Sequence, residues 1–227
     1  MGSTVQDLLG RLSGRDGEPR RRAWARACAK ALGLGGIAVT VHEELVWFSD
    51  ATSERLEDLQ FVLGQGPGLG LDDPADMRQI PDLGELLARR WPQFAPEAAK
   101  LGVAALFVWP VRFGAVPVGT LTGYRRTTGA LTPRQVSEGR LVADVLAEHV
   151  LATWPSTPGA TDGPGHAGTV DLHRAEVHQA TGVLSVRLGI SLPEALDRLR
   201  ARAHASGRSL TGTARDILRQ ELPHDAP

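Results

Sequence analysis

The side chains best suited to bind a charged ligand are arginines, and they gather near the end of the chain. Residues 171–220 hold eight arginines and no lysine against five acids, which gives a formal charge of +3, although the whole chain carries −1. A small basic segment of this kind favours a polyanionic partner. Its arginines are Arg174, Arg187, Arg198, Arg200, Arg202, Arg208, Arg215 and Arg219.

Other kinds of chemistry find little support. Cys28 is the single cysteine, which excludes an internal disulfide framework and a cysteine-based zinc cluster. The sequence shows no paired carboxylates, no nucleophile with a base and no metal cluster at a spacing that would suit catalysis or metal binding. We therefore expect neither an enzyme nor a metal site. The glycine-dense segment 64–70 lacks the Gly-Lys-Ser/Thr ending of a phosphate-binding loop and is interpreted as a loop between a helix and the next strand.

Length and composition are those of a soluble globular chain. The 227 residues are enough for two small domains, and 42% of them are hydrophobic and 22% charged. The sequence has no apolar run of the roughly 18 residues that a membrane helix needs. The first residues lack a basic segment followed by an apolar run, so we expect no signal peptide and a cytoplasmic protein.

The first two thirds of the chain alternate between helical and strand patterns. Residues 1–17 are mixed and polar and are expected to be loosely held. A hairpin is expected from 37–41 and 44–48, and a second antiparallel pair from 103–111 and 117–124. Helices are expected over 19–34, 82–91 and 96–101, followed by a long one from Thr132 to about Trp154. Thr132 and Gln135 form a capping box at its start, and its apolar stripe could pack on the sheet, on a second subunit, or on both.

This order of elements resembles a GAF domain over residues 17–154. The residues that carry the resemblance are Leu63–Pro67, the strands Phe107–Val111 and Val118–Leu121, and the capped helix after Leu131. The resemblance implies an antiparallel sheet flanked by helices, with a pocket for a small molecule on one face. The cyclic-nucleotide signature is missing, Cys28 is badly placed for a bilin, and no histidine stands out as a haem ligand. The ligand and any cofactor are therefore unknown.

Residues 155–170 are rich in glycine and proline and are predicted to be a flexible linker. A coil of this length has a root-mean-square span of roughly 20 Å. The linker marks a domain boundary, and a second domain is predicted at 171–222.

The second domain is expected to be an all-α module of three short helices, so the fold class of the chain is α+β. Gly189 ends the first helix, Ser191 with Glu194 caps the second, and Ser209 caps the third. A module of this size buries little surface by itself, so the apolar face of its first helix is expected to form a homodimer. That face consists of Val177, Ala180, Leu184 and Leu188.

The module resembles an ANTAR domain. The matching positions are Ala180, Gly182, Leu184, Gly189–Ser191, Glu194, Ala195, Leu199, Arg200, Ala203, Leu210 and Ala214. The resemblance implies a dimer that binds paired RNA stem-loops in nascent transcripts and prevents formation of a terminator. Two positions depart from the family: Thr181 stands where lysine is common, and Ser185 where methionine is common.

RNA recognition requires donors for phosphates and planes that stack on splayed bases, and a guanidinium supplies both. The residues predicted to bind RNA are Thr181, Arg200, Arg202, Arg208, Ser209 and Arg215. The alternative for each arginine is a solvated side chain or an internal ion pair, such as Arg198 or Arg202 with Glu194 or Asp197. Because the module has no aromatic residue, aromatic stacking is not expected.

The leading hypothesis is an antitermination regulator whose RNA binding is controlled by a signal at the GAF-like domain. Three small helices with arginines are also typical of a helix-turn-helix, so a DNA-binding regulator is the first alternative. A signalling scaffold with reduced RNA binding is the second, and Thr181 is the residue that favours it.

Overall fold

The computed structural model describes residues 5–10, 18–41, 44–71, 77–153, 174–206 and 208–221. The chain divides into two compact units, of which the first includes residues 1–61 and 65–171 and the second includes residues 172–227. Each unit is described by itself. The linker predicted at 155–170 lies outside the described residues. Within the described part, no helix is long and apolar enough to cross a membrane.

The first unit is built on a five-stranded antiparallel sheet of order β2-β1-β5-β4-β3. Its strands are β1 (Gly36–Val41), β2 (Glu44–Phe48), β3 (Arg78–Ile80), β4 (Ala105–Phe113) and β5 (Val116–Arg125). Both predicted hairpins are confirmed, because β1 pairs with β2 and β4 pairs with β5. The short strand β3 pairs with β4 at the edge of the sheet and was not predicted.

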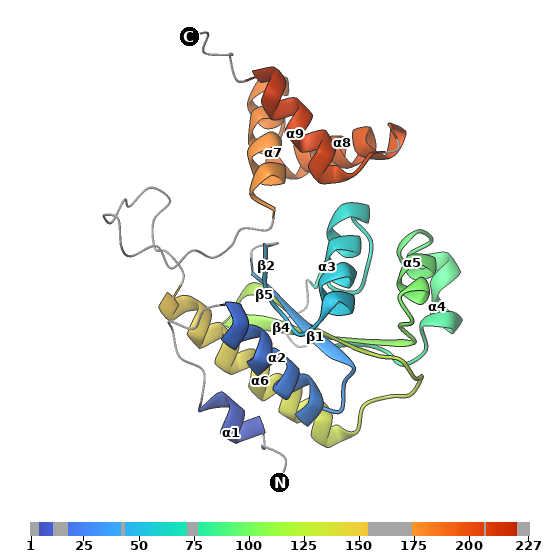
Figure 1. Ribbon diagram of the computed structural model, residues 1–227, viewed down its shortest axis with the longest axis vertical. Coiled ribbons are helices and arrows are strands. Elements are labelled where there is room, and N and C mark those ends of the chain that lie inside the picture. Colours follow the sequence, from blue (N-terminus) through green and yellow to red (C-terminus); the bar gives the residue numbers. More distant parts are fainter. Residues whose placement is uncertain are drawn as a thin grey trace. The chain divides into compact units, whose positions relative to one another are not determined.

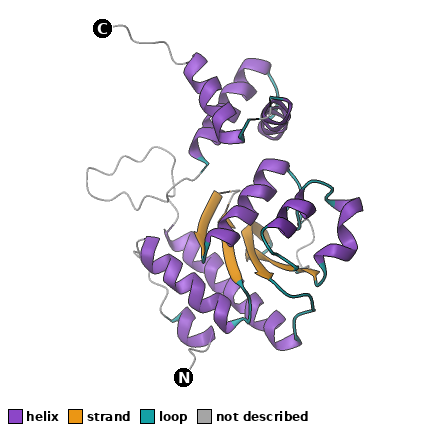
Figure 2. Cartoon of the chain, turned by 45° about the vertical axis from the view of Figure 1, so that its right-hand side comes forward, coloured by secondary structure: helices purple, strands orange, loops and turns teal. Residues whose placement is uncertain are grey.

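Helices cover both faces of this sheet, as Figures 1 and 2 show. Helices α2 (Glu18–Ala31) and α6 (Pro133–Thr153) lie on one side, and α3 (Ala51–Leu63), α4 (Leu83–Arg90) and α5 (Phe94–Lys100) on the other. The predicted order of helix, two strands, helical insert, two strands and long helix is therefore observed, with the short strand β3 added within the helical insert. Together with the helical second unit, this arrangement confirms the α+β fold class.

The start of the chain differs from expectation. Residues Val5–Leu9 form a short helix, α1, whose Val5 and Leu8 side chains are buried in the core of the first unit. The indole Nε1 of Trp24 donates a hydrogen bond of 2.8 Å to the carbonyl of Leu8. The expectation of a loosely held segment is wrong for these five residues, because contacts with α2 hold them in place.

The apolar stripe of α6 packs on the sheet, which was the first of the alternatives considered for it. Val142 and Leu146 are fully buried in one cluster with Trp109 of β4. The Trp109 indole also donates to the carbonyl of Val136, at 3.1 Å. A Cβ atom at Gly139 would lie 2.3 Å from the Trp109 ring, so glycine lets the helix approach the sheet.

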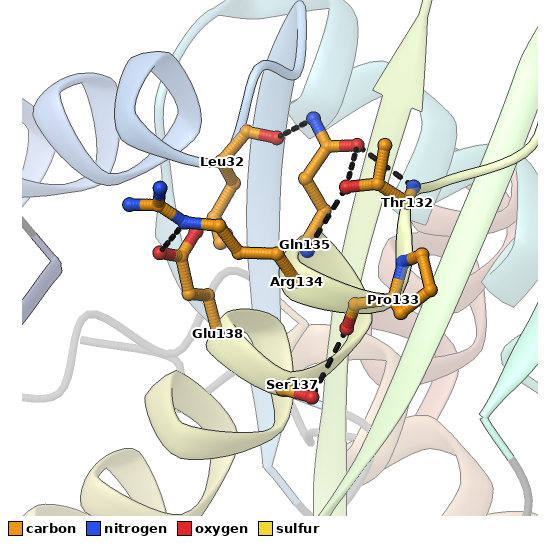
Figure 3. A network of polar contacts seen from close by, with 7 residues as sticks. All are labelled: Leu32, Thr132, Pro133, Arg134, Gln135, Ser137 and Glu138. Carbon is orange, nitrogen blue, oxygen red and sulfur yellow. Dashed lines mark hydrogen bonds and ion pairs between the residues drawn. The ribbon is translucent and has the colours of Figure 1, made fainter.

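Polar contacts fix the first turn of α6 (Figure 3). The amide of Thr132 donates to Gln135 Oε1 at 3.0 Å, and the amide of Gln135 donates to Thr132 Oγ1 at 3.3 Å. This reciprocal pair is the predicted capping box. Gln135 Nε2 also donates to the carbonyl of Leu32 at 3.0 Å, so the capping residue ties α6 to the segment that follows α2.

Burial of Cys28 makes the stability of the first unit depend on pH. Burial raises the pKa of this thiol from its ordinary value of 9.0 to about 12. Between pH 9 and pH 12 the thiol is deprotonated in the unfolded chain but stays protonated in the folded chain. The free energy of unfolding therefore falls as the pH rises above 9. We expect the free energy of unfolding to fall by about 1.4 kcal/mol more in wild type than in Cys28→Ala between pH 7 and pH 10.

Urea titrations followed by tryptophan fluorescence measure this difference, because all five tryptophans precede residue 155. The Cys28→Ala variant is the control for every other group that titrates in this range. An equal loss in the two proteins would contradict the prediction.

The second unit consists of α7 (Ala175–Leu188), α8 (Leu192–Ala205) and α9 (Leu210–Glu221). Gly189 ends α7 in the left-handed conformation with φ of 62°. Ser191 Oγ accepts the amide of Glu194, and Ser209 Oγ accepts the amide of Gly212, so both predicted serine caps are confirmed. The three helices share one core, to which Leu199, Leu210 and Ile217 contribute fully buried or nearly fully buried side chains.

Candidate nucleic-acid interface

Most arginines of the second unit lie in exposed ion pairs. On α8, Arg198 bonds Glu194 and Arg200 bonds Asp197, each at 2.9 Å. Arg215 of α9 bonds Glu176 of α7 at 2.8 Å, and this carboxylate raises the pKa of Arg215. Asp216 pairs with both Arg208 and Arg219. The alternative of an internal pair is therefore observed for Arg198, as well as for three of the four arginines predicted to bind RNA.

Arg202 is the exception among those four. It lies exposed on α8, and within the described part of the chain its guanidinium has no acidic partner. A phosphate can approach this group without displacing a carboxylate. By contrast, the guanidinium of Arg200 is paired with the carboxylate of Asp197.

Thr181 does not lie where an RNA-binding group has to lie. Its side chain is buried, and its hydroxyl donates a hydrogen bond of 2.7 Å to the carbonyl of Val177. Residue 181 falls on the core side of α7, one turn after Val177. This corrects the expectation that Thr181 presents its hydroxyl to RNA.

Ser209 remains at the surface beside Arg208, at the start of α9. Its Oγ is already the acceptor for the amide of Gly212, at 3.0 Å. The hydroxyl can still donate a hydrogen bond to a phosphate, so a role for Ser209 in RNA binding stays a prediction.

The predicted dimer face is mostly the core of the unit itself. Val177, Ala180 and Leu184 are buried, and α7 packs on both α8 and α9. Leu188 alone of the four predicted residues is exposed, at 44%. The other three were expected to form a dimer because the sequence indicated no partner for their apolar side chains. That reason no longer holds, since these side chains pack on helices of the same chain. Val186 and Leu192 are also exposed, and neither was among the four predicted dimer residues.

The described residues of the first unit form at least two surface clefts, and the sequence did not predict which residues line them. One, of about 540 Å³, lies between β4 and α6 and is lined by residues that include Trp109, Arg112, Arg140 and Asp144. The other, of about 400 Å³, lies beside α4 and α5 and is mostly apolar. Among the described residues there is no group of three or more histidine, cysteine, aspartate or glutamate side chains that could hold a metal.

Comparison with known families identifies the second unit. Residues 172–218 match the ANTAR domain family. The chain therefore contains an ANTAR domain, the domain of an RNA-binding family of antitermination regulators. A search of curated protein sequences gives no match to this chain.

Several solved structures are similar to this chain at low sequence identity. The GAF domain of a phosphoenolpyruvate-protein phosphotransferase from Acinetobacter has a TM-score of 0.49 and 9% identity, over 68% of this chain and 92% of its own. The nlh2 GAF domain of A. aeolicus in an inactive state has a TM-score of 0.44 and 11% identity, over 65% of this chain and 91% of its own.

A type II free methionine-R-sulfoxide reductase from Thermoplasma acidophilum has a TM-score of 0.41 and 17% identity, over 60% of this chain and 96% of its own. All three TM-scores lie below 0.5, so nothing about the function of this chain follows from these likenesses.

Proposed function

We propose that this protein is a transcription antitermination regulator that binds RNA stem-loops through its ANTAR domain. The observation that carries the proposal is the match of residues 172–218 to this family of RNA-binding domains. The net charge of +3 over residues 171–220 supports it, because phosphate contacts dominate the affinity of proteins for nucleic acids.

Within this domain, Arg202 is the group we expect to contribute most as a phosphate contact. It is exposed and has no acidic neighbour among the described residues. Arg208 and Arg215 would have to exchange the carboxylates of Asp216 and Glu176 for a phosphate. Because exposed ion pairs contribute little stability, this exchange costs little, but a nearby carboxylate repels the incoming phosphate.

We further propose that the GAF-like unit, within residues 17–154, controls the ANTAR domain in response to a small molecule. Control of this kind requires a ligand whose affinity differs between an RNA-binding arrangement of the chain and a silent one. The two clefts of the first unit are places where such a ligand would be sought.

The prediction for Arg202 is a loss of affinity that depends on salt. Arg202→Ala should weaken binding to a paired stem-loop RNA about 3- to 10-fold and reduce the slope of log K against log salt by about 0.7–0.9, as expected for one lost phosphate contact. Fluorescence anisotropy of the labelled RNA at several salt concentrations measures both quantities.

The matched control is Arg134→Ala, which removes an exposed arginine of the first unit that pairs with Glu138. This variant should bind RNA as wild type does. Tighter binding of wild type to duplex DNA than to the paired stem-loop would favour the DNA-binding alternative, and a lack of salt-dependent RNA binding would overturn the proposal.

A further inference from the structure

Strand β4 continues past the end of its neighbour β3, and a cleft lies beside the part that continues. The three residues of β3 pair with Leu106–Val108, whereas β5 pairs with β4 as far as Phe113. Among the described residues, Trp109–Phe113 therefore have a strand on one side only. Pro110 has no N–H to give to a sheet, and proline is largely confined to sheet edges. This edge is thus better suited to a small ligand than to a further strand.

The cleft combines apolar side chains with charges of both signs. Its volume of about 540 Å³ lies in the range of small-molecule sites. Met77, Trp109 and Phe113 supply apolar surface, and Phe113 is 57% exposed. The charged members of the described lining are two arginines and two acids, so they carry no net charge: Arg112, Arg140, Asp144 and Glu148.

Arg112 has one nitrogen held in place and another without an acceptor. Its Nη2 donates a hydrogen bond of 2.7 Å to the carbonyl of Ala115, in the turn that joins β4 to β5. Its Nη1 is shielded from water and has no hydrogen-bond partner among the described residues. Such a donor is unfavourable, because it loses its bond to water and gains none in return. A carboxylate bound in the cleft would supply the acceptor once the guanidinium turns toward it, since the two groups fit each other through paired hydrogen bonds.

Two carboxylates of α6 line the same cleft without a cation paired to them. Asp144 and Glu148 are exposed, and their side chains form no ion pair or hydrogen bond within the described part of the chain. They are four residues apart, which places them about 6 Å from each other along the helix. An ammonium group can bond to both, because it has three donors.

We propose that this cleft binds a zwitterionic small molecule of the amino-acid class with an apolar side chain. The ligand carboxylate pairs with Arg112, the ammonium group pairs with Asp144 and Glu148, and the side chain packs against Phe113. A plain carboxylate is repelled by the two acids and a plain amine by the arginines, so the ligand has to carry both charges. The proposal rests on the proposed function in one respect, because it names the ligand class to which the GAF-like unit responds.

Calorimetric titration of the full chain with L-leucine and with L-phenylalanine tests the ligand class. Each amino acid has two matched analogues, the amine that lacks the carboxylate and the N-acetyl derivative that lacks the ammonium charge. At least one amino acid should bind with a dissociation constant below about 1 mM, and both of its analogues should bind at least about 10-fold more weakly. If neither amino acid binds, or if an analogue binds as tightly as its parent, the proposal is wrong.

Substitutions in the cleft test the site. Arg112→Met, which removes the charge and keeps a long side chain, should weaken binding of the amino acid at least about 10-fold. The double variant Asp144→Asn with Glu148→Gln should do the same. Arg134→Met is the matched control, because it makes the first change at an arginine of α6 that does not line the cleft, and it should bind as wild type does.

Wild-type affinity in either cleft variant would overturn the proposal, because the ligand would then bind elsewhere, for example in the apolar cleft beside α4 and α5. Both acids are exposed on α6, so the double variant should keep the wild-type melting temperature. It therefore decides the matter even if Arg112→Met destabilises the fold.

A separate measurement distinguishes this site from the proposed control of RNA binding. The affinity for labelled stem-loop RNA is measured by fluorescence anisotropy with and without saturating amino acid. If the amino acid binds in the cleft and the RNA affinity stays the same, the proposed control fails while the assignment of the cleft stands. If the RNA affinity changes in wild type and not in the double variant, both are supported.

Discussion

Replacing Leu199 with alanine is expected to unfold the ANTAR domain and abolish RNA binding. Leu199 is fully buried among the three helices. Truncation of a buried leucine to alanine costs about 2–5 kcal/mol, because transfer free energy is lost and a cavity remains. A unit of about 50 residues has a free energy of unfolding of roughly 3–7 kcal/mol, so this single change removes most of it.

The two units can be followed separately in this experiment. All tryptophans precede residue 155, and residues 171–222 contain no aromatic residue. Thermal unfolding of Leu199→Ala should show an early loss of helical circular dichroism while tryptophan fluorescence changes at the wild-type temperature.

Leu192→Ala is the matched control, because it makes the same change on the same helix at a side chain that is 58% exposed. Its stability should lie within about 0.5 kcal/mol of wild type. If Leu199→Ala were as stable as this control, the packing of the three helices described above would be wrong.

Trp109→Ala is expected to destabilise the first unit by about 3–5 kcal/mol. Trp109 of β4 is almost completely buried against α6, and its indole donates a hydrogen bond to the carbonyl of Val136. The substitution removes a large side chain that joins the long helix to the sheet. Urea denaturation followed by the remaining tryptophans measures the loss.

Phe113→Ala is the control on the same strand, since Phe113 is 57% exposed and its truncation should cost little. Gly139→Ala provides a further check, because the added methyl group would clash with the Trp109 ring and should destabilise wild type by about 1–3 kcal/mol. In the Trp109→Ala background the same methyl group has space, so its cost should disappear. If the destabilising effects of Trp109→Ala and Gly139→Ala were additive, the contact between Gly139 and the Trp109 ring would be contradicted.

Signals confined to a few neighbouring residues were sufficient to predict several helix ends and both hairpins. The Thr132–Gln135 capping box and the Ser191 and Ser209 caps depend on side chains within three residues of each other. Strand β3 had no such signal, because its three residues are held by hydrogen bonds to β4. Helix α1 escaped prediction for a similar reason, since its Leu8 carbonyl is held by Trp24, 16 residues away.

The arginines of residues 171–220 are alike in side-chain type, and the structure separates them by their exposure and their ion pairs. Sequence alone determined the number of charges, the helix caps, the α+β class and the resemblance to an ANTAR domain, because these depend on residue types and short spacings. Only the tertiary structure decided that Thr181 is buried, that Arg215 pairs with Glu176, and that Arg202 is exposed without an acidic partner in the described chain. The physical reason is that burial and ion pairing depend on which helix faces meet, and those faces come from residues up to 39 positions apart.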